Sequence, residues 1–575
     1  MTEKAWLTDT EPGTRYPLYT RLNASDVLPD PVTPLGCDLA WNTHILAGWA
    51  SGYVELGAFK ADELFSGPSA VAGIFFGHLY VNLSTSRVSG IRHGLGWEAM
   101  DAAFFAGDVP APPHESMPSD VNEELSAKIA ARRAWAMTTD TFPELEEDRW
   151  MADRVRSERP DLSVMSAAAL VARARSMMPI ERLMWRGETI AGNQSAVGPG
   201  VLAQLLAAAD PTLVIRVIGS AGDVDSAAPA YALWDLSRAI RSDASLAAAF
   251  EQGVDGLGER LDAHPTFGKA LAGFLRDFGY RGPSEWDLGS PTWETKPELV
   301  LGLLDRMRLL DNAAAPTIRA AKQDEGTASA VAEAIAILGD DDEAVATLHA
   351  AIGSARRFGA WRERGKTNCI KVMHEARMPI YELGRRLVEA GHLAHPYQVF
   401  MALDAELDTL VLNPASLLEP LAAREAEWRK LFDIKLPTFI DSRLPLPTLA
   451  SLHRLSETAV PRATVGEVLQ GGPASAGIAR GRARIVADPS GARDLEPGEI
   501  LVAPHTDPSW TPLFLVSAGV VVDVGAMSSH AMIVSRELGI PCAAGVPHAS
   551  RRIPDGALIE VDGSAGRVTV LELPA

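Results

Sequence analysis

Residues 519–545, GVVVDVGAMSSHAMIVSRELGIPCAAG, decide the fold of the C-terminal part of this chain. Residues 519–524 are apolar and β-branched apart from one aspartate, and a glycine follows them, which predicts a short buried strand. From Ala531 the apolar residues recur at helical spacing until Gly539 and Pro541, which together are a typical helix stop. The stretch therefore predicts a strand, a turn and a helix in that order.

His530 is predicted in the first turn of this helix. Ser528 or Ser529 is the expected N-cap, because a serine oxygen can accept a hydrogen bond from an unpaired first-turn N–H group. The positive end of the helix dipole disfavours imidazolium, so the ring is expected to be neutral and nucleophilic. The same N–H groups favour a bound phosphate. A phosphoryl carrier is one interpretation, and a capping histidine at the edge of the core fits these local features as well.

The size and charge of the chain limit its class. A chain of 575 residues with 47% hydrophobic and 22% charged residues is typical of a globular protein with two to four domains. Its net charge of −21 disfavours nucleic acid and anionic membranes as partners. The N-terminal residues lack the pattern of a secretion signal, and the longest apolar runs are too short or interrupted to span a membrane. We therefore expect a cytoplasmic protein.

The three cysteines, Cys37, Cys369 and Cys542, are widely separated in the sequence. This spacing fits neither a disulfide framework nor a thiolate zinc site, and we predict that all three are buried as small apolar residues. No set of residues in the chain is predicted as a metal site.

The pattern along the chain predicts a multidomain protein. Residues 1–432 are expected to form a mainly α-helical domain, with amphipathic helices from about residue 120 onward. Residues 433–468 contain spaced prolines and little periodicity, and are predicted to be a linker. Residues 469–575 contain several strand-length pieces and one clear helix, so they are predicted to form a small α/β domain. A proline-spaced linker permits that domain to move as a unit.

Four stretches within residues 469–575 resemble the swivelling phosphohistidine domain of the phosphoenolpyruvate (PEP)-utilising family, which includes PEP synthase, pyruvate phosphate dikinase and rifampin phosphotransferase. The stretches are GGPASAGIARGRARIV, ILVAPHTDPSW, DVGAMSSHAMIVSRELGIPCAAG and DGALIEVDGSAGRVTVL. This resemblance implies that His530 is the phosphoryl carrier. The residues that fall on the family pattern are Asp523, Gly525, Ser529, His530, Arg536, Glu537 and Gly545, whereas Ala526 stands where the family commonly has glycine.

Arg536 follows His530 by about one and a half helical turns. Its guanidinium is predicted to bind two phosphate oxygens at once, if the fold brings it round to the histidine. The alternative is a solvated charge on the helix surface.

Residues 20–430 resemble the substrate domain of the rifampin phosphotransferase branch. The matching stretches are LPDPVTPL, FGYRGPSEWDLGSPTWETKPE, WRERGK and LGRRLVEAGHL. Tyr280 stands where the family usually has histidine, so the identity of the substrate is not carried over.

The stretch WRERGKTNCIKVMHEAR, residues 361–377, is a candidate for binding the transferring phosphoryl group. Arg362, Lys366 and His374 are the predicted catalytic or binding residues: the two cations stabilise the phosphoryl oxygens, and the histidine takes the acceptor's proton. The residues expected on one helical face are Arg362, Lys366, Cys369, Met373 and Arg377. The alternative is a solvated basic face with His374 at its edge.

Arg281, Glu285, Trp286 and Trp293 lie among glycine and proline turns, and are predicted to bind the acceptor. Aromatic walls suit a flat aromatic molecule. The alternative is that the tryptophans simply form the core.

The resemblance also implies a partner. The chain has no glycine-rich phosphate loop with a lysine, so we expect a separate ATP-grasp subunit to supply the phosphoryl group from ATP with Mg²⁺. This arrangement is similar to split aryl kinases such as phenylphosphate synthase and the kinase of hydroxyphenyl ketones, heteromeric enzymes of aromatic-compound catabolism. The implied reaction converts ATP, a hydroxyl acceptor and water to the phosphorylated acceptor, AMP and phosphate. A phenol is the favoured acceptor, because its pKa of about 10 makes it easy to ionise.

Two other functions stay open at this point. One is a rifampin-like antibiotic phosphotransferase with the same chemistry. The other is a phosphocarrier or regulatory protein without a small-molecule substrate, which the large second domain disfavours. A PEP-forming enzyme is also disfavoured, since those enzymes have an additional barrel domain that this helix-rich chain does not offer.

Overall fold

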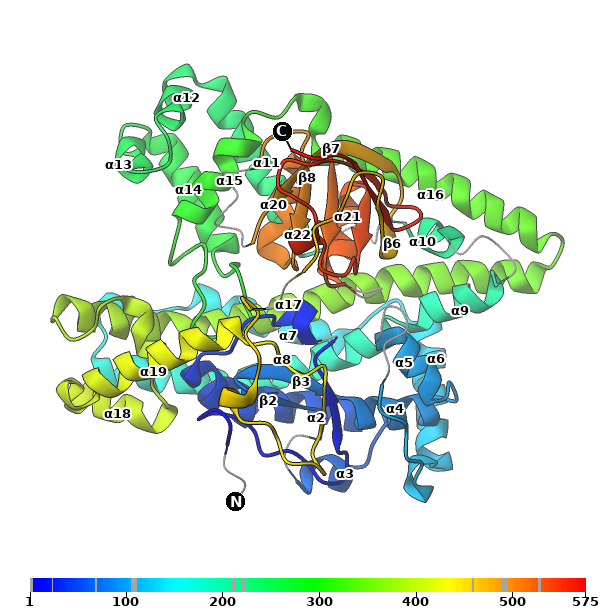
Figure 1. The fold of residues 1–575 in the computed structure, drawn as a ribbon, viewed down its shortest axis with the longest axis horizontal. Helices are drawn as coiled ribbons and strands as arrows, with labels where there is room; N and C mark the ends of the chain where they lie inside the picture. Colours follow the sequence, from blue (N-terminus) through cyan, green and yellow to red (C-terminus); the bar gives the residue numbers. More distant parts are fainter. Residues whose placement is uncertain are drawn as a thin grey trace. The chain divides into compact units, whose positions relative to one another are not determined.

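The computed structural model describes residues 4–22, 24–67, 70–104, 111–207, 212–219, 224–457, 460–487, 495–525 and 529–574 (Figure 1). The chain forms two compact units. Unit 1 consists of Met1–Gln194, Ser284–Ser290 and Arg364–Ala459, and unit 2 of Ser195–Pro283, Pro291–Glu363 and Val460–Ala575. The division into three domains, 1–432, 433–468 and 469–575, stays a prediction. The compact units show which parts of the chain pack together, and they do not show which segments move.

Unit 1 contains a four-stranded sheet with the order β2-β3-β1-β4. Its strands pair antiparallel and are β1 (Leu18–Thr20), β2 (Ala72–Phe75), β3 (His78–Asn82) and β4 (Phe439–Asp441). Strand β4 lies within the predicted linker, and Tyr80 donates to the carbonyl oxygen of Pro437 next to it (2.9 Å). This part of the predicted linker is therefore bonded into the sheet of unit 1.

Helices make up most of unit 1. They are α1 (Ala24–Val27), the π-helix η1 (Gly36–Ile45), α2 (Leu46–Glu55), α3 (Ala61–Phe65), α4 (Leu83–Arg92), α5 (Trp97–Phe104), α6 (Glu123–Thr138), α7 (Pro143–Ser157), α8 (Ala167–Gln194), α18 (Asp404–Leu412) and α19 (Leu418–Lys430). The short 3₁₀ segments are η2 (Pro118–Asp120), η3 (Leu162–Val164), η5 (Pro396–Met401), η6 (Pro414–Leu417), η7 (Leu431–Asp433) and η8 (Leu449–Ser451).

Unit 2 begins with further helices. They are α9 (Val197–Leu205), α10 (Thr212–Ile218), α11 (Ala228–Ser242), α12 (Ala244–Glu251), α13 (Leu257–Leu261), α14 (Pro265–Phe278), α15 (Glu298–Met307), η4 (Asn312–Ala314) and α16 (Pro316–Leu338). Helix α17 (Asp342–Glu389) starts in unit 2 and continues into unit 1. No helix in the described part of the chain is long and apolar enough to cross a membrane.

The C-terminal part of unit 2 is an eight-stranded sheet with the order β5-β12-β11-β7-β8-β9-β10-β6. Its elements are β5 (Val468–Gln470), β6 (Gly472–Ser475), β7 (Ile478–Ile485), β8 (Ile500–Ala503), η10 (Pro508–Trp510), α20 (Thr511–Val516), β9 (Gly519–Val522), α21 (His530–Leu538), β10 (Cys542–Ala544), α22 (Ala549–Arg552), β11 (Leu558–Asp562) and β12 (Arg567–Glu572). The prediction of a mainly helical chain with a C-terminal α/β region is confirmed.

Strands β7, β8, β9 and β10 run parallel in the middle of this sheet. Strands β8 and β9 are buried along their whole length, as their continuous apolar sequences indicate. Their side chains alternate between two cores: Leu501 and Val520 face one core, and Ile500 and Val521 face the other. Parallel strands place their carboxyl ends at one edge, so the loops after β8 and β9 meet there.

The cysteine prediction is confirmed, since Cys37, Cys369 and Cys542 are free and buried.

Candidate functional site

His530 is the first residue of α21, as predicted. Ser529 is the N-cap, with φ −67° and ψ 157°, and its hydroxyl accepts a hydrogen bond from the backbone N–H of Met532. Gly539, with φ 62°, ends the helix in the left-handed conformation that glycine adopts easily. The alternative N-cap, Ser528, and the departure from the family pattern at Ala526 lie outside the described residues.

Two threonine hydroxyl groups hold the imidazole ring of His530. Its Nδ1 atom lies 3.1 Å from Oγ1 of Thr506, and its Nε2 atom lies 3.1 Å from Oγ1 of Thr511. The residue is only 8% exposed, and the ring of Phe514 packs against it nearly at a right angle, with centroids 5.7 Å apart. A hydroxyl group can donate to one ring nitrogen and another can accept from the second, so the neutral ring is satisfied at both nitrogens.

The loops around His530 are fixed by carboxylates. Asp507 accepts hydrogen bonds from the backbone N–H (2.8 Å) and hydroxyl (2.5 Å) of Ser509 in the loop after β8. Asp523, which follows β9, accepts from the backbone N–H (2.7 Å) and hydroxyl (2.5 Å) of Ser550. Burial raises the pKa of Asp523 to about 6, against the opposing effect of the Ser550 bonds. These hydrogen bonds fix Asp507 and Asp523, which follow strands β8 and β9.

Two glycines of the family pattern also lie at this edge. A Cβ atom on Gly525 would lie 3.0 Å from the side chain of Ala544 and 3.2 Å from the hydroxyl of Ser529. Gly545 has a φ of 64°. The first position leaves little room for a side chain, and the second uses the backbone freedom of glycine.

Arg536 is half-buried on α21, and its Nε donates to the carbonyl oxygen of Met532 (2.9 Å) in the same helix. Burial lowers its pKa, and the neighbouring Glu537 opposes this effect. The alternative, a solvated charge on the helix surface, stays open for this half-buried side chain. Phosphate binding by Arg536 stays a prediction.

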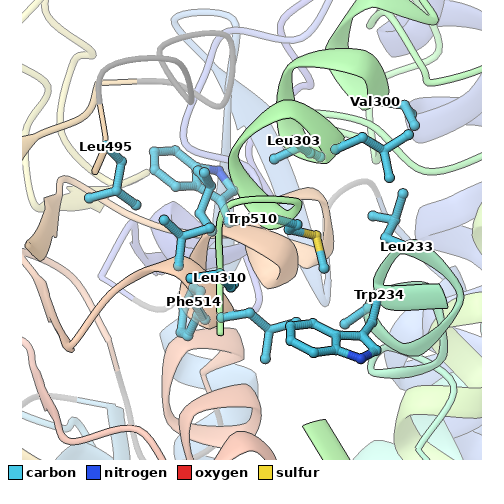
Figure 2. Close-up of a cluster of buried hydrophobic side chains, with 14 of the residues drawn as sticks. Leu233, Trp234, Val300, Leu303, Leu310, Leu495, Trp510 and Phe514 are labelled. Carbon is cyan, nitrogen blue, oxygen red and sulfur yellow. The ribbon is translucent and has the colours of Figure 1, made fainter. Parts of the chain in front are cut away.

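The C-terminal module, residues 469–575, packs against helices of the same unit: α20, which carries Thr511 and Phe514, packs against α11 and α15, and α21 packs against α16. The two parts share one apolar core, in which Trp510 and Phe514 lie among residues from these helices (Figure 2). The labelled residues of the helical part are Leu233, Trp234, Val300, Leu303 and Leu310.

A second group of predicted site residues meets in unit 1 around Arg377. Its Nη2 atom donates to the carbonyl oxygens of Glu285 (2.9 Å) and Asp287 (2.8 Å), and its Nε donates to that of Leu288 (3.0 Å). Its Nη1 atom lies 3.3 Å from Nδ1 of His374. His374 and Arg377 are both fully buried. The alternative interpretation, a solvated face with His374 at its edge, is wrong for this part of α17.

Arg377 and the carboxyl groups near it have shifted pKa values. Burial lowers the pKa of Arg377 to about 10, while Asp287 raises it. Burial raises the pKa of Asp287 to about 6, although its Oδ1 atom accepts hydrogen bonds from the backbone N–H and hydroxyl (2.7 Å) of Thr33. Burial also raises the pKa of Glu181 well above its ordinary value. Sequence reasoning missed Asp287 and Glu181, because nothing in the sequence shows which chain segments surround Arg377.

The predicted aromatic residues divide between the units. In unit 1, Trp286 packs against Trp185 with centroids 4.9 Å apart, and its carbonyl oxygen accepts from Nε1 of Trp41 (3.1 Å). In unit 2, Trp293 stacks on Phe274 with centroids 5.6 Å apart, within the apolar core. The structure thus brings Glu285, Trp286 and His374 together, whereas Trp293 lies in the other unit.

The remaining predicted residues are basic. Arg281 is buried in unit 2, where its guanidinium lies over the ring of Tyr280 at 5.1 Å and its carbonyl oxygen accepts from the backbone N–H of Trp293 (2.7 Å). Arg362 and Lys366 are half-buried on successive turns of α17. Among the residues that the structure describes, no group of three or more histidine, cysteine, aspartate or glutamate side chains is placed to hold a metal ion.

Two protein-family models match the chain. The rifampicin phosphotransferase fourth domain matches residues 187–363, and the mobile domain of PEP-utilising enzymes matches residues 495–566. The second match includes His530 and the two threonines that hold its ring.

Several curated relatives match the chain over about half its length. A Mycobacterium tuberculosis protein described as uncharacterized is 34% identical over 324 residues, which make up 55% of this chain and 33% of that protein. The rifampicin phosphotransferases of Streptomyces sviceus and Bacillus subtilis are 31% and 27% identical over 308 residues, or 52% of this chain and 34% of each relative. The matched part thus spans about a third of the length of these relatives.

These findings relate the chain to phosphotransferases of the PEP-utilising type. The family resemblance predicted from the sequence motifs is confirmed by both domain matches and by the named relatives. This chain is therefore a relative of the rifampicin phosphotransferase-like branch of the PEP-utilising enzymes.

Proposed function

We propose that this chain is the acceptor-phosphorylating component of an ATP-dependent, dikinase-type phosphotransferase, with His530 as the phosphoryl carrier. The observation that carries this proposal is a buried imidazole at the N-terminus of α21, with a hydroxyl group at each ring nitrogen, inside the region that matches the mobile domain. A neutral imidazole at a helix N-terminus is a nucleophile in a place that favours the phosphate it accepts.

The phosphoryl group comes from ATP bound with Mg²⁺ by an ATP-grasp subunit, which we propose is a separate polypeptide. Support comes from the sequence, since residues 1–575 contain no glycine-rich phosphate loop followed by a lysine. ATP and Mg²⁺ supply the activated phosphate on that partner. This chain supplies the imidazole that receives it.

The second half-reaction passes the group to the hydroxyl of a small, phenolic acceptor. The phosphorus–nitrogen bond breaks while a phosphorus–oxygen bond forms, and a base takes the hydroxyl proton. Arg362 and Lys366 supply positive charge to the phosphoryl oxygens, and His374 is the proposed base. Glu285 and Trp286, which lie with His374 in unit 1, are the proposed acceptor contacts.

Phosphoryl transfer requires that His530 leaves its present surroundings. His530 is only 8% exposed, and its ring lies against Phe514, which belongs to the apolar core shared with α11 and α15. We propose that the module swings out on the part of the predicted linker that follows β4 to reach the ATP-grasp partner. Two half-reactions at separate sites need a carrier that moves between them.

The test is phosphoprotein formation. The chain is incubated with the proposed ATP-grasp partner, radiolabelled ATP and Mg²⁺, and an acid-labile label is expected on the wild type but not on His530→Ala or His530→Asn. His548→Asn is the matched control, because His548 has a φ of 57°, which asparagine tolerates. It is expected to be labelled like the wild type. Labelled His530→Asn protein would overturn the assignment of the carrier.

The separate-subunit proposal has its own test. The purified chain with ATP and Mg²⁺ alone is expected to show no phosphorylation of any acceptor, and clear activity would refute a separate ATP-binding subunit.

Rifampicin phosphorylation is the second candidate function, favoured by the similarity to two rifampicin phosphotransferases. A panel of simple phenols and rifampicin, assayed with the partner present, separates the two. Phosphorylation of phenols alone supports the aryl kinase, and phosphorylation of rifampicin alone supports the antibiotic phosphotransferase.

A further inference from the structure

Residues 506–511 follow strand β8 and contribute both hydroxyl groups that contact His530. Thr506 and Thr511 are 1% and 0% exposed, so their hydroxyl groups are not hydrogen-bonded to bulk water. Each lies 3.1 Å from a different ring nitrogen. The carrier role alone explains why a histidine is needed, but not why two buried threonines face it.

The segment that holds these threonines is itself fixed. The side chain of Asp507 binds the backbone N–H of Ser509, and the backbone N–H of Trp510 donates to the carbonyl oxygen of Asp507 (2.9 Å). Thr511 is the first residue of α20, with proline next to it in the first turn. The backbone around Thr511 is therefore fixed by contacts that do not involve the histidine.

The two ring nitrogens are not equivalent. Nδ1 is bonded to the ring carbon that carries the side chain, whereas Nε2 lies at the far end of the ring and is less hindered. A phosphoryl group is therefore accommodated more easily on Nε2, the nitrogen that faces Thr511. Thr506 at Nδ1 then decides which tautomer the ring adopts, because the partner of one nitrogen fixes the proton on the other.

We propose that Thr511 is a positioning residue for phosphoryl transfer, which rests on the proposed carrier role of His530. Its hydroxyl occupies Nε2 in the unphosphorylated protein. When Nε2 carries the phosphoryl group, the same hydroxyl, which moves together with His530 in the module, donates to a phosphoryl oxygen. Thr506 keeps the proton on Nδ1 by accepting a hydrogen bond from the Nδ1–H group, so that Nε2 presents its lone pair.

The experiment compares Thr511→Val, which keeps the shape and removes the hydroxyl, with Thr511→Ser, which keeps the hydroxyl. Ser517→Ala is the matched control, since Ser517 is also buried, at the other end of α20, and its hydroxyl donates to the carbonyl oxygen of Phe514 and not to His530. Phosphoramidate serves as a small phosphoryl donor that needs no partner protein. The readouts are the ¹⁵N shifts of the His530 ring, the ³¹P signal of the phosphohistidine, and its lifetime.

In the wild type, the ¹⁵N shifts are expected to show a neutral ring with the proton on Nδ1, and the ³¹P signal to show Nε2-phosphohistidine. Thr511→Val is expected to shorten the lifetime of the phosphohistidine at least about tenfold, because the charged phosphoryl group loses one hydrogen bond. Thr511→Ser is expected to restore it to within about threefold. Thr506→Val is expected to change the tautomer, and Ser517→Ala to change neither readout.

The proposal is overturned if Thr511→Val matches Ser517→Ala in the lifetime and the ¹⁵N shifts, or if the phosphoryl group is on Nδ1. Labelling of His530→Asn by the partner would instead overturn the carrier role itself, so the two failures are distinguishable. If Thr511→Val does not fold, as judged by circular dichroism, Thr511→Ala is measured in its place with the same criteria.

Discussion

Arg377 binds the backbone of Asp287, a residue 90 positions earlier in the chain, through a hydrogen bond of 2.8 Å from Nη2 to the carbonyl oxygen. Two further bonds, to Glu285 and Leu288, complete the contact, and the arginine is fully buried. One side chain thus fixes the loop that contains the predicted acceptor contacts Glu285 and Trp286.

Arg377→Met is expected to reduce the free energy of unfolding by about 3–5 kcal/mol, because it leaves three buried carbonyl groups without their donor. Urea unfolding measures the change. Arg385→Ala is the control on the same helix: Arg385 is 41% exposed and pairs with Glu382, so its loss is expected to cost less than about 1 kcal/mol. Equal effects of the two variants would contradict this role of Arg377.

The C-terminal module is held to the helices of unit 2 by apolar contacts. Phe514 is fully buried in the shared core and packs on His530, so Phe514→Ala is expected to cost about 3–5 kcal/mol and to expose the imidazole. Urea unfolding and the reactivity of His530 with diethyl pyrocarbonate measure the two effects. An unchanged His530 reactivity in this variant would show that Phe514 does not cover the ring.

Helix α15 and the C-terminal module are also joined by an ion pair between Arg306 and Glu496, 2.7 Å apart, with side chains 18% and 55% exposed. Solvent screens such a pair, so a double-mutant cycle with Arg306→Ala and Glu496→Ala is expected to give a coupling of no more than about 1 kcal/mol. A larger coupling would mean that charge, and not apolar packing, holds the module.

Gly563 is placed where a side chain does not fit. A Cβ atom there would lie 2.0 Å from the carbonyl oxygen of Ser475 and 2.7 Å from the backbone nitrogen of Cys542, atoms that cannot move aside as a flexible side chain can. Gly563→Ala is expected to cost at least about 2 kcal/mol. Thermal unfolding measures the change.

Gly268 is the matched control for this substitution. It lies in α14, and a Cβ atom there meets nothing within 4 Å. Gly268→Ala is expected to stabilise the protein by about 0.5–1 kcal/mol, since glycine is a poor helix former. The opposite order of the two variants would contradict the close approach at Gly563.

The position of His530 could be predicted from sequence because its signals are local. The buried strand, the serine N-cap and the closing Gly539 and Pro541 all lie within one short stretch. Thr506 and Thr511 could not be predicted in the same way. They reach His530 because the parallel strands β8 and β9 place the loops that follow them at one edge of the sheet. The order of strands in a sheet cannot be predicted from the spacing of residues within one short stretch.

The helical part was harder to interpret for a similar reason. Trp286 and Trp293 lie seven residues apart in the sequence, yet Trp286 packs with Trp185 in unit 1 and Trp293 packs with Phe274 in unit 2. Tryptophan is favoured both in binding sites and in apolar cores, so the residue type does not separate the two roles. The face of α17 had the same ambiguity until the burial of His374 and Arg377 resolved it.

Asp148 on α7 is a carboxyl group whose pKa is raised by burial. It is 7% exposed, its Oδ2 atom has no hydrogen-bond partner among the described residues, and burial raises its pKa to about 7. The unfolded chain releases this proton near its ordinary pKa of about 4, so between about pH 4 and 7 the folded state binds more protons than the unfolded state. The free energy of unfolding is therefore expected to fall as the pH rises through this range.

Asp148→Asn removes this titration. At each pH, the free energy of unfolding of the variant is compared with that of the wild type. This difference is expected to rise by about 2–4 kcal/mol in favour of the variant between pH 4 and pH 8, whatever its value at pH 4. Glu158→Gln, at a side chain 62% exposed just after the same helix, is the control and is expected to follow the wild type. Urea unfolding at several pH values measures the three curves. Parallel curves for Asp148→Asn and the wild type would mean that Asp148 already ionises at its ordinary pKa in the folded protein.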